Sequence, residues 1–162
     1  MLTADNGMYL RPACADDEHF LLSLRNDPIT RRMSFSKECI DPAEHRVWFH
    51  RVLQDTDRII FIGERNGERI GMVRIDYNKI GIAKVNIAMA PEWRGQGLGI
   101  ALLTSSLDKF AQFKNASFTF VAEVLPENNA STRTFSSAGF SLEKDTIDSG
   151  SVEKLIYVKQ SC

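Results

Sequence analysis

The stretch Arg94-Gly95-Gln96-Gly97-Leu98-Gly99 stands between two apolar runs, Val85-Asn86-Ile87-Ala88-Met89-Ala90-Pro91 before it and Ile100-Ala101-Leu102-Leu103 after it. This pattern predicts a strand, a glycine-rich turn and the start of a helix. Glycines let backbone N–H groups come close to an anion, and a helix N-terminus adds unpaired donors and a favourable dipole. Since the dipole contributes only about 0.3–1 kcal/mol at an exposed site, several N–H groups must share the binding. The stretch therefore predicts a phosphate-binding turn to which Arg94 adds a cation.

Two familiar glycine-rich motifs do not fit this stretch. A P-loop requires Gly-Lys-Ser/Thr after its glycines, whereas Gly99 is followed by Ile100-Ala101. A dinucleotide-binding G-x-G-x-x-G pattern would place its third glycine on Ile100 or Leu102. A phosphate site of another kind and a glycine-rich turn without a function are the alternatives that remain.

The composition is that of an ordinary globular protein. The chain has 162 residues, of which 43% are hydrophobic and 25% charged, and this predicts one domain over residues 1–162. The net charge of -1 argues against a nucleic-acid surface. No apolar stretch reaches the roughly 18–20 residues that span a bilayer, and the polar start from Met1 to Gly7 does not read as a secretory signal. Because Cys14, Cys39 and Cys162 are odd in number and far apart, we expect a reducing, cytoplasmic setting.

Periodicity and turn signals predict an α/β (α+β) protein in the order β-α-α-β-β-β-α-β-α-β-β. Asp41-Pro42 reads as a helix start, Asn66-Gly67 as a hairpin turn, and Gly139 as a helix end. This order predicts a mixed, mostly antiparallel central sheet flanked by helices. The predicted strands are 9–11, 58–64, 68–76, 82–89, 117–124, 140–147 and 152–158, and the predicted helices are 15–26, 41–53, 98–113 and 129–138.

Two motifs in this element order resemble the GCN5-related N-acetyltransferase family. The first is R/Q-x-x-G-x-G/A, which Arg94, Gly97 and Gly99 match. The second is Asn128-x-x-Ser131-x-x-x-Phe135-x-x-x-Gly139-Phe140, which is similar to the N-x-x-A/S-x-x-x-Y-x-x-x-G-F segment of many members. Two motifs in the right order are far more specific than either alone, and the resemblance covers essentially the whole chain.

The resemblance implies acetyl-CoA as the acetyl donor. The backbone of a splayed strand at its end would pair with the pantetheine arm and polarise the thioester carbonyl, and the glycine-rich turn would hold the pyrophosphate. Asn128 would contact the pantetheine arm or, alternatively, cap a helix. The residues assigned to acetyl-CoA in this way are Ile87, Ala88, Met89, Arg94, Gly95, Gln96, Gly97, Leu98, Gly99, Ile100, Asn128, Ser131 and Phe135.

A narrower resemblance concerns the acceptor. The segments 24–28, 41–49 and 70–76 look like the acetyltransferases of amino-sugar nucleotides, nearest those of the pseudaminic-acid pathway and next to the ribosomal-protein N-acetyltransferases. The implied acceptor is a primary amine, the 4-amino group of a UDP-linked amino-dideoxy sugar. The alternatives are acetylation of protein N-termini and a non-catalytic CoA-binding sensor, and a homodimer is a further expectation. The candidate acceptor residues are Arg25, Asn26, Trp48, Arg74, Asp76 and Tyr77.

Acetyl transfer to an amine requires a proton acceptor and a donor for the departing sulfur. Glu123 is the first candidate base, because it stands five residues before Asn128, where the ribosomal-protein enzymes carry a catalytic Glu. A general base works best when burial raises its pKa. His45 is the second, since an imidazole titrates near neutral pH. Phe135 stands where many members have a Tyr that acts as the general acid. Either another donor, such as Tyr77 or a water molecule, would protonate the sulfur, or the thiolate would leave unassisted.

Two negative expectations complete the mechanism. No cysteine lies in a motif, so direct attack in a ternary complex is expected rather than an acetyl-enzyme. His45 and His50 are spaced i,i+5, which is not the spacing of a zinc-binding pair, so no metal is expected.

Overall fold

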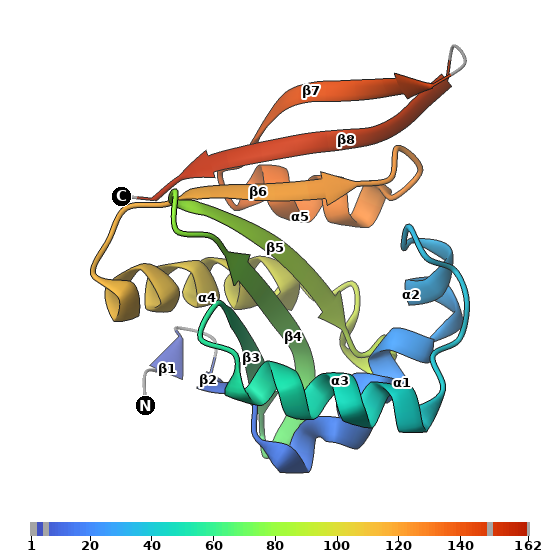
Figure 1. Cartoon of the computed structure of the whole chain (residues 1–162), viewed down its shortest axis with the longest axis vertical. Coiled ribbons are helices and arrows are strands. Elements are labelled where there is room, and N and C mark those ends of the chain that lie inside the picture. The colour runs from blue at the N-terminus through green and yellow to red at the C-terminus, as the bar shows by residue number, and fades with distance from the viewer. Residues whose placement is uncertain (1–2, 5–6, 149–150, 162) are drawn as a thin grey trace.

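The computed structural model describes residues 3–4, 7–148 and 151–161, and within them the strands form one sheet (Figure 1). The strand order is β1-β2-β3-β4-β5-β6-β8-β7. Only β5 and β6 run parallel, and all other neighbours are antiparallel. The strands are β1 (Thr3–Ala4), β2 (Met8–Pro12), β3 (Arg58–Arg65), β4 (Glu68–Tyr77), β5 (Ile82–Met89), β6 (Thr119–Val124), β7 (Ser141–Asp148) and β8 (Ser151–Gln160).

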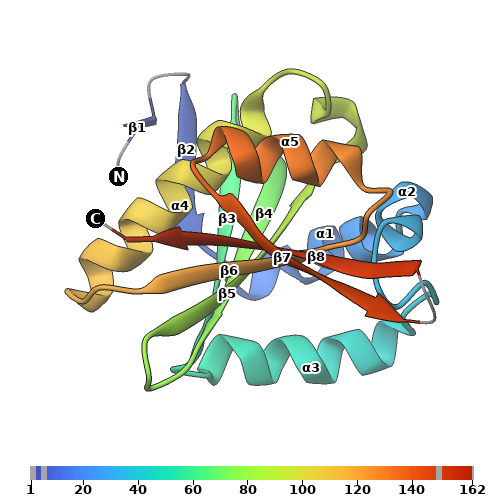
Figure 2. The ribbon, with the colours of Figure 1, turned by 90° about the horizontal axis from the view of Figure 1, so that it is seen from above.

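Helices cover both faces of this sheet (Figure 2). One core joins α4, α5 and the sheet, and a second core joins α1 and α3 to the opposite face of β3. The predicted mixed, mostly antiparallel sheet with flanking helices is therefore confirmed. The helices are η1 (Ala15–Asp17), α1 (Glu18–Asn26), α2 (Pro28–Arg32), α3 (Pro42–Gln54), η2 (Pro91–Trp93), α4 (Leu98–Lys114) and α5 (Asn129–Ser137).

Three elements were not predicted from the pattern: β1, α2 and the three-residue helix η2. The strand β1 has two residues, which is too short for a period of two to show. The helix α2 has five residues and buries none of them, so it has no apolar stripe. Its start nevertheless carries a local signal: Pro28 is at the first helical position, and the Asp27 carboxylate accepts a hydrogen bond from the Thr30 N–H.

A glycine in β4 lets α4 and the end of β5 pack closely. Gly71 pairs with Met89 in the β4–β5 register. A Cβ at Gly71 would lie 2.7 Å from the Ala88 carbonyl oxygen and 3.1 Å from Leu102 Cδ2. Any larger residue would push the end of β5 away from α4, and this strand end forms one wall of the pocket described below.

In the part of the chain that the structure describes, no helix combines the length and the apolarity needed to cross a membrane.

Candidate active site

The two parallel strands at the centre of the sheet separate toward their carboxyl ends. Pairing between β5 and β6 covers Ile82–Lys84 and Thr119–Val121 only. Beyond Lys84, the residues of β5 up to Met89 pair with β4 alone among the described residues. The free edge of β5 offers backbone N–H and C=O groups to an extended ligand. The splayed strand expected at residues 87–89 is confirmed.

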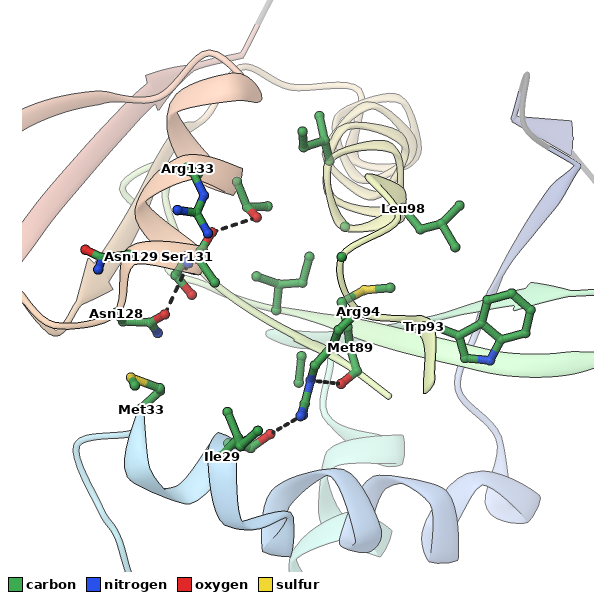
Figure 3. A pocket seen from close by; sticks show the side chains of 18 of the residues that line it. Ile29, Met33, Met89, Trp93, Arg94, Leu98, Asn128, Asn129, Ser131 and Arg133 are labelled. Carbon is green, nitrogen blue, oxygen red and sulfur yellow. Dashed lines mark hydrogen bonds between the residues drawn. The ribbon is translucent and has the colours of Figure 1, made fainter. Parts of the chain in front are cut away.

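A pocket of about 730 Å³ lies beside this strand end (Figure 3). Its walls are α2, the end of β5, the glycine-rich turn with the start of α4, and α5 with the loop before it. Most of the residues expected to hold acetyl-CoA come together here: Ile87, Ala88, Met89, Arg94, Gly95, Gly97, Leu98, Gly99, Ile100, Asn128 and Ser131. Gln96 is not among the lining residues, and its side chain donates to the Glu92 carbonyl oxygen at 3.1 Å.

The turn has the backbone that an anion site requires. Gly95 and Gly97 have φ angles of +73° and +75°, and Gly97 is the N-cap of α4. A Cβ at either position would meet nothing within 4 Å, so the conformation rather than the space explains these glycines. The first residues of α4 line the pocket, and their N–H groups have no acceptor within the helix. These groups and the free edge of β5 fit the phosphates and the amide arm of a CoA molecule.

The Arg94 side chain is engaged by the protein itself. Its Nη2 donates to Asp27 Oδ2 at 2.8 Å and to Thr30 Oγ1 at 3.1 Å. Its Nε donates to the Met89 carbonyl oxygen at 3.2 Å (Figure 3). The guanidinium expected to help hold the pyrophosphate therefore already has three protein acceptors.

The second motif also has a structural part. Asn128 caps α5 by accepting a hydrogen bond from the Ser131 N–H at 3.1 Å, and both residues line the pocket. Phe135 corrects an expectation: it is 3% exposed, packs edge-on against Phe140 at 5.0 Å, and is not among the lining residues. Its apolar ring is a core residue, so it does not form a surface for the pantetheine arm.

On the opposite face of the sheet, five strands contribute one charged residue each. These residues, called the charged row below, are Arg58, Asp76, Lys84, Glu123 and Lys154. Arg58 Nε lies 3.7 Å from Asp76 Oδ1, and Asp76 is paired with Lys84 in the β4–β5 register. The two lysine ammonium groups contact the two oxygens of Glu123, Lys84 at 3.0 Å and Lys154 at 3.2 Å. The Lys84–Glu123 ion pair spans the point at which β5 and β6 separate.

Glu123, the first candidate base, lies two residues beyond the last β6 residue paired with β5. Burial acts to raise its pKa, but the hydrogen bonds and charges of Lys84 and Lys154 outweigh burial and hold the pKa below its ordinary value. This lowered pKa is the opposite of the raised pKa that suits a general base. Glu123 is therefore an anion at neutral pH, and it does not line the pocket.

His45, the second candidate, is 2% exposed and lies between α3 and the sheet. Its ring stacks on Phe49 at 6.0 Å and is tilted against Trp48 at 5.5 Å. Burial lowers its pKa, and the charge of Glu18 offsets this only in part. The imidazole is neutral near pH 7 and is not among the pocket-lining residues.

The candidate acceptor residues do not form one cluster. Arg74 and Asp76 share the face of the charged row, with Arg74 Nε 3.3 Å from Asp76 Oδ2 and the Arg74 guanidinium 5.8 Å from the centre of the Trp48 ring. Tyr77 packs instead against Phe110 on the α4 side, and its hydroxyl accepts a hydrogen bond from Lys114 at 2.6 Å. Tyr77 is not among the pocket-lining residues, and its role as a donor to the sulfur stays a prediction.

Arg25 and Asn26 hold the segment that follows α2. Arg25 donates to the Ser36 carbonyl oxygen at 2.9 Å. Asn26 donates to the Ile40 carbonyl oxygen at 2.9 Å and accepts from the Ile40 N–H at 2.8 Å. These contacts assign both side chains a structural part, and substrate contacts remain a prediction.

Sequence reasoning missed the pocket wall formed by α2. Ile29 and Thr30 of this helix line the pocket, together with Met33 and Ser34 directly after it. The Asp27-Pro28 pair was a usable signal for its start, since it repeats the Asp41-Pro42 pattern that predicts α3. The residues described by the structure contain no group of three or more His, Cys, Asp or Glu side chains placed to hold a metal ion.

A known family has this arrangement of sheet, turn and pocket. Residues 8–141, more than half of the chain, match the model of a family described as an acetyltransferase (GNAT) domain. The chain therefore belongs to the GNAT acetyltransferase family. It is an N-acetyltransferase that uses acetyl-CoA, and the glycine-rich turn and the free edge of β5 are the groups that fit this donor.

Solved structures share the fold over nearly the whole chain. A spermidine N-acetyltransferase from Vibrio cholerae, in complex with CoA and spermine, has a TM-score of 0.84 at 21% identity, covering 96% of this chain and 96% of that chain. The protein yncA from Salmonella typhimurium, with its cofactor acetyl-CoA, has a TM-score of 0.77 at 19% identity, covering 96% and 94%. A dodecameric spermidine N-acetyltransferase from Vibrio cholerae has a TM-score of 0.77 at 22% identity, covering 96% and 94%. A comparison with curated proteins found no match.

Proposed function

We propose that this N-acetyltransferase acetylates a primary amine on an acceptor that carries negative charge. The 4-amino group of a UDP-linked amino-dideoxy sugar is the specific acceptor proposed. The observation that carries this proposal is the charged row on the face opposite the CoA pocket, where it borders the separation of β5 and β6.

The charges on this face favour an anionic acceptor. The charged row and its direct partners, Arg74 and Asp55, include four cations and three carboxylates among the described side chains. Both carboxylates nearest the splay, Asp76 and Glu123, are already paired with cations. A surplus cation attracts a phosphate, and it also lowers the pKa of a nearby amine, since like charges disfavour the protonated form. The acceptor nitrogen would thus arrive neutral and ready to attack.

The proposed reaction is direct attack in a ternary complex. The amine nitrogen bonds to the thioester carbonyl carbon, the carbon–sulfur bond breaks, and one proton passes in net from nitrogen to sulfur. Backbone N–H groups at the free edge of β5 stabilise the charge that develops on the carbonyl oxygen. Glu123, which is an anion at neutral pH, accepts the proton that the nitrogen loses. The sulfur then takes its proton from water, because Phe135 offers none.

A polyamine is the competing acceptor, since two of the similar structures are spermidine N-acetyltransferases. A polyamine carries several positive charges, and the two carboxylates nearest the splay, Asp76 and Glu123, are already paired with cations. Acetylation of protein N-termini and CoA binding without turnover are the remaining alternatives, and the missing hydroxyl at Phe135 keeps the latter open.

The test is acetyl-CoA turnover, followed by release of the free thiol, with four acceptors: a UDP-linked 4-amino sugar, the same amino sugar without the nucleotide, spermidine and a short peptide. We expect the first to have the highest kcat/KM. The Lys154→Met variant should raise the KM of the nucleotide-linked acceptor and leave that of the free sugar unchanged. A preference for spermidine or the peptide would overturn the acceptor assignment, and CoA binding without turnover would favour a sensor.

Two broader assignments belong to the same proposal. We infer that residues 1–162 act as one acetyltransferase domain, because β7 and β8, which lie almost wholly outside the matched residues, complete the same sheet. A cytoplasmic location, supported by the exposed free thiols of Cys14 and Cys39, and assembly as a homodimer are also proposed.

A further inference from the structure

Helix α2 forms a wall of the CoA pocket although little of it is buried. Its residues Ile29 and Thr30 line the pocket, as does Met33 directly after the helix, and none of the helix residues is buried. The helix packs against α1 and projects from the body of the fold (Figure 1). A wall of this kind needs a specific contact to keep its place, because burial of apolar surface holds it only weakly.

The contact that reaches α2 from the other side of the pocket is the Arg94 guanidinium. It joins the Asp27 carboxylate at the start of α2 to the end of β5. There its Nε donates to the carbonyl oxygen of Met89 (Figure 3). The Asp27 side chain is 13% exposed and that of Arg94 is 27% exposed, so water screens the pair only in part. The Thr30 hydroxyl accepts a further hydrogen bond from Arg94. One side chain thus spans the pocket wall, the phosphate turn and the strand that faces the thioester.

We propose that Asp27 is a positioning residue of the CoA site, which holds Arg94 in place so that Arg94 keeps α2 against the end of β5. Arg94 keeps these contacts when CoA binds, and the pyrophosphate is held by backbone N–H groups of the turn and of the first turn of α4. Burial acts to raise the pKa of Asp27, but the Thr30 N–H and Arg94 outweigh burial and hold it below its ordinary value, which keeps the carboxylate charged.

An arrangement in which Arg94 binds CoA instead of Asp27 makes a different prediction for the affinity of CoA. If Arg94 released Asp27 to bind the pyrophosphate, the carboxylate would compete with CoA for the guanidinium. Neutralising Asp27 would then strengthen CoA binding or leave it unchanged. If Asp27 positions Arg94, the same change must weaken CoA binding.

The discriminating variant is Asp27→Asn in the full chain. Asparagine caps a helix about as well as aspartate, so α2 keeps its N-cap while the charge facing Arg94 is lost. We expect the Kd of CoA, measured by titration calorimetry, to rise about tenfold, because a charge-assisted hydrogen bond is replaced by a neutral one. Arg94→Gln should have a similar effect, and the double variant should bind no more weakly than either single one.

The matched control is Asp41→Asn, at the N-cap of α3, where the carboxylate accepts from the N–H groups of Ala43 and Glu44. This variant should leave the Kd of CoA unchanged. Thr30→Val is a milder second variant, since it removes one acceptor of Arg94 and keeps Asp27; we expect a two- to threefold weaker binding. An unchanged or lower Kd for Asp27→Asn, or additive effects in the double variant, would overturn the proposal. The titration needs no acceptor, so its outcome is independent of the acceptor assignment above.

Discussion

Replacing Glu123 with Gln separates a chemical role of this carboxylate from a structural one. Its side chain is 25% exposed, and those of its partners Lys84 and Lys154 are 50% and 29% exposed. Ion pairs of this exposure each contribute about 0.2–1 kcal/mol, so the free energy of unfolding should fall by less than about 2 kcal/mol. A general base contributes roughly 10²–10⁴ in rate, which corresponds to about 2.7–5.4 kcal/mol of transition-state stabilisation. The expected loss of stability is therefore smaller than the expected loss of transition-state stabilisation, so the two roles can be told apart.

The assay is the initial rate of thiol release at saturating acetyl-CoA and acceptor, together with urea unfolding of the same protein preparation. We expect Glu123→Gln to lower kcat at least about 100-fold and to leave the KM of acetyl-CoA nearly unchanged. Lys84→Met is the matched control, because it breaks the ion pair at the splay and keeps the carboxylate. This variant should raise the KM of an anionic acceptor more than it lowers kcat.

A loss of less than about tenfold in kcat for Glu123→Gln would refute the role of Glu123 as the base. The charged row would then act on the acceptor only through its electrostatic field. Equal losses of kcat in the Glu123 and Lys84 variants would also refute the role of Glu123 as the base. Both changes break the Lys84–Glu123 ion pair, but only the change at Glu123 removes the proton acceptor.

Three further changes test the fold around the site. Gly71→Ala should lower the free energy of unfolding by about 2–3 kcal/mol, because the new Cβ meets a backbone carbonyl oxygen at 2.7 Å. Gly63→Ala should lower it by less than about 1 kcal/mol, because its Cβ meets the flexible end of a leucine side chain. Urea unfolding of both variants measures the difference. The buried His45 has a lowered pKa, so below its ordinary pKa of 6.5 the unfolded chain binds the proton first, and the free energy of unfolding decreases as the pH decreases. His45→Leu should flatten this decrease below pH 6.5 in unfolding curves. Asp17→Asn removes the fully buried carboxylate that accepts a hydrogen bond from Arg11 at 2.7 Å. The free energy of unfolding, measured by thermal unfolding, should fall by about 2–4 kcal/mol. A variant as stable as the parent protein would argue against a structural role for this carboxylate.

The main elements of the fold could be predicted because each carries a local signal. The helix α3 begins at the Asp41-Pro42 cap and β3 turns into β4 at Asn66-Gly67, as predicted. The helix predicted from residue 15 starts as the short η1 turn, since Asp17 is drawn into the fold by Arg11 and Arg69. That interaction joins residues far apart in the chain, and a local pattern cannot contain it.

The donor side and the acceptor side of the site also differ in how far a local sequence pattern can predict them. The donor side is built from contiguous residues, the end of β5, the turn and α4, so a motif describes it almost completely. What the motif could not reveal is that the cation at Arg94 meets Asp27, 67 positions earlier in the chain. A guanidinium beside a glycine-rich turn suggests an anion, and here the anion within reach is a carboxylate of the protein.

The acceptor side depends on register rather than on any motif. The charged row takes one residue from each of five strands, and these residues meet only because the pairings Arg58 with Asp76 and Asp76 with Lys84 place them at one level. A shift of one residue in any of these pairings would turn the charged side chain into the core that α4 covers. No short segment of the chain therefore carries the information that a surplus of cations borders the splay. For this reason two motifs in the sequence point to the acetyl donor, whereas the proposal of an anionic acceptor rests on charges that only the folded sheet brings together.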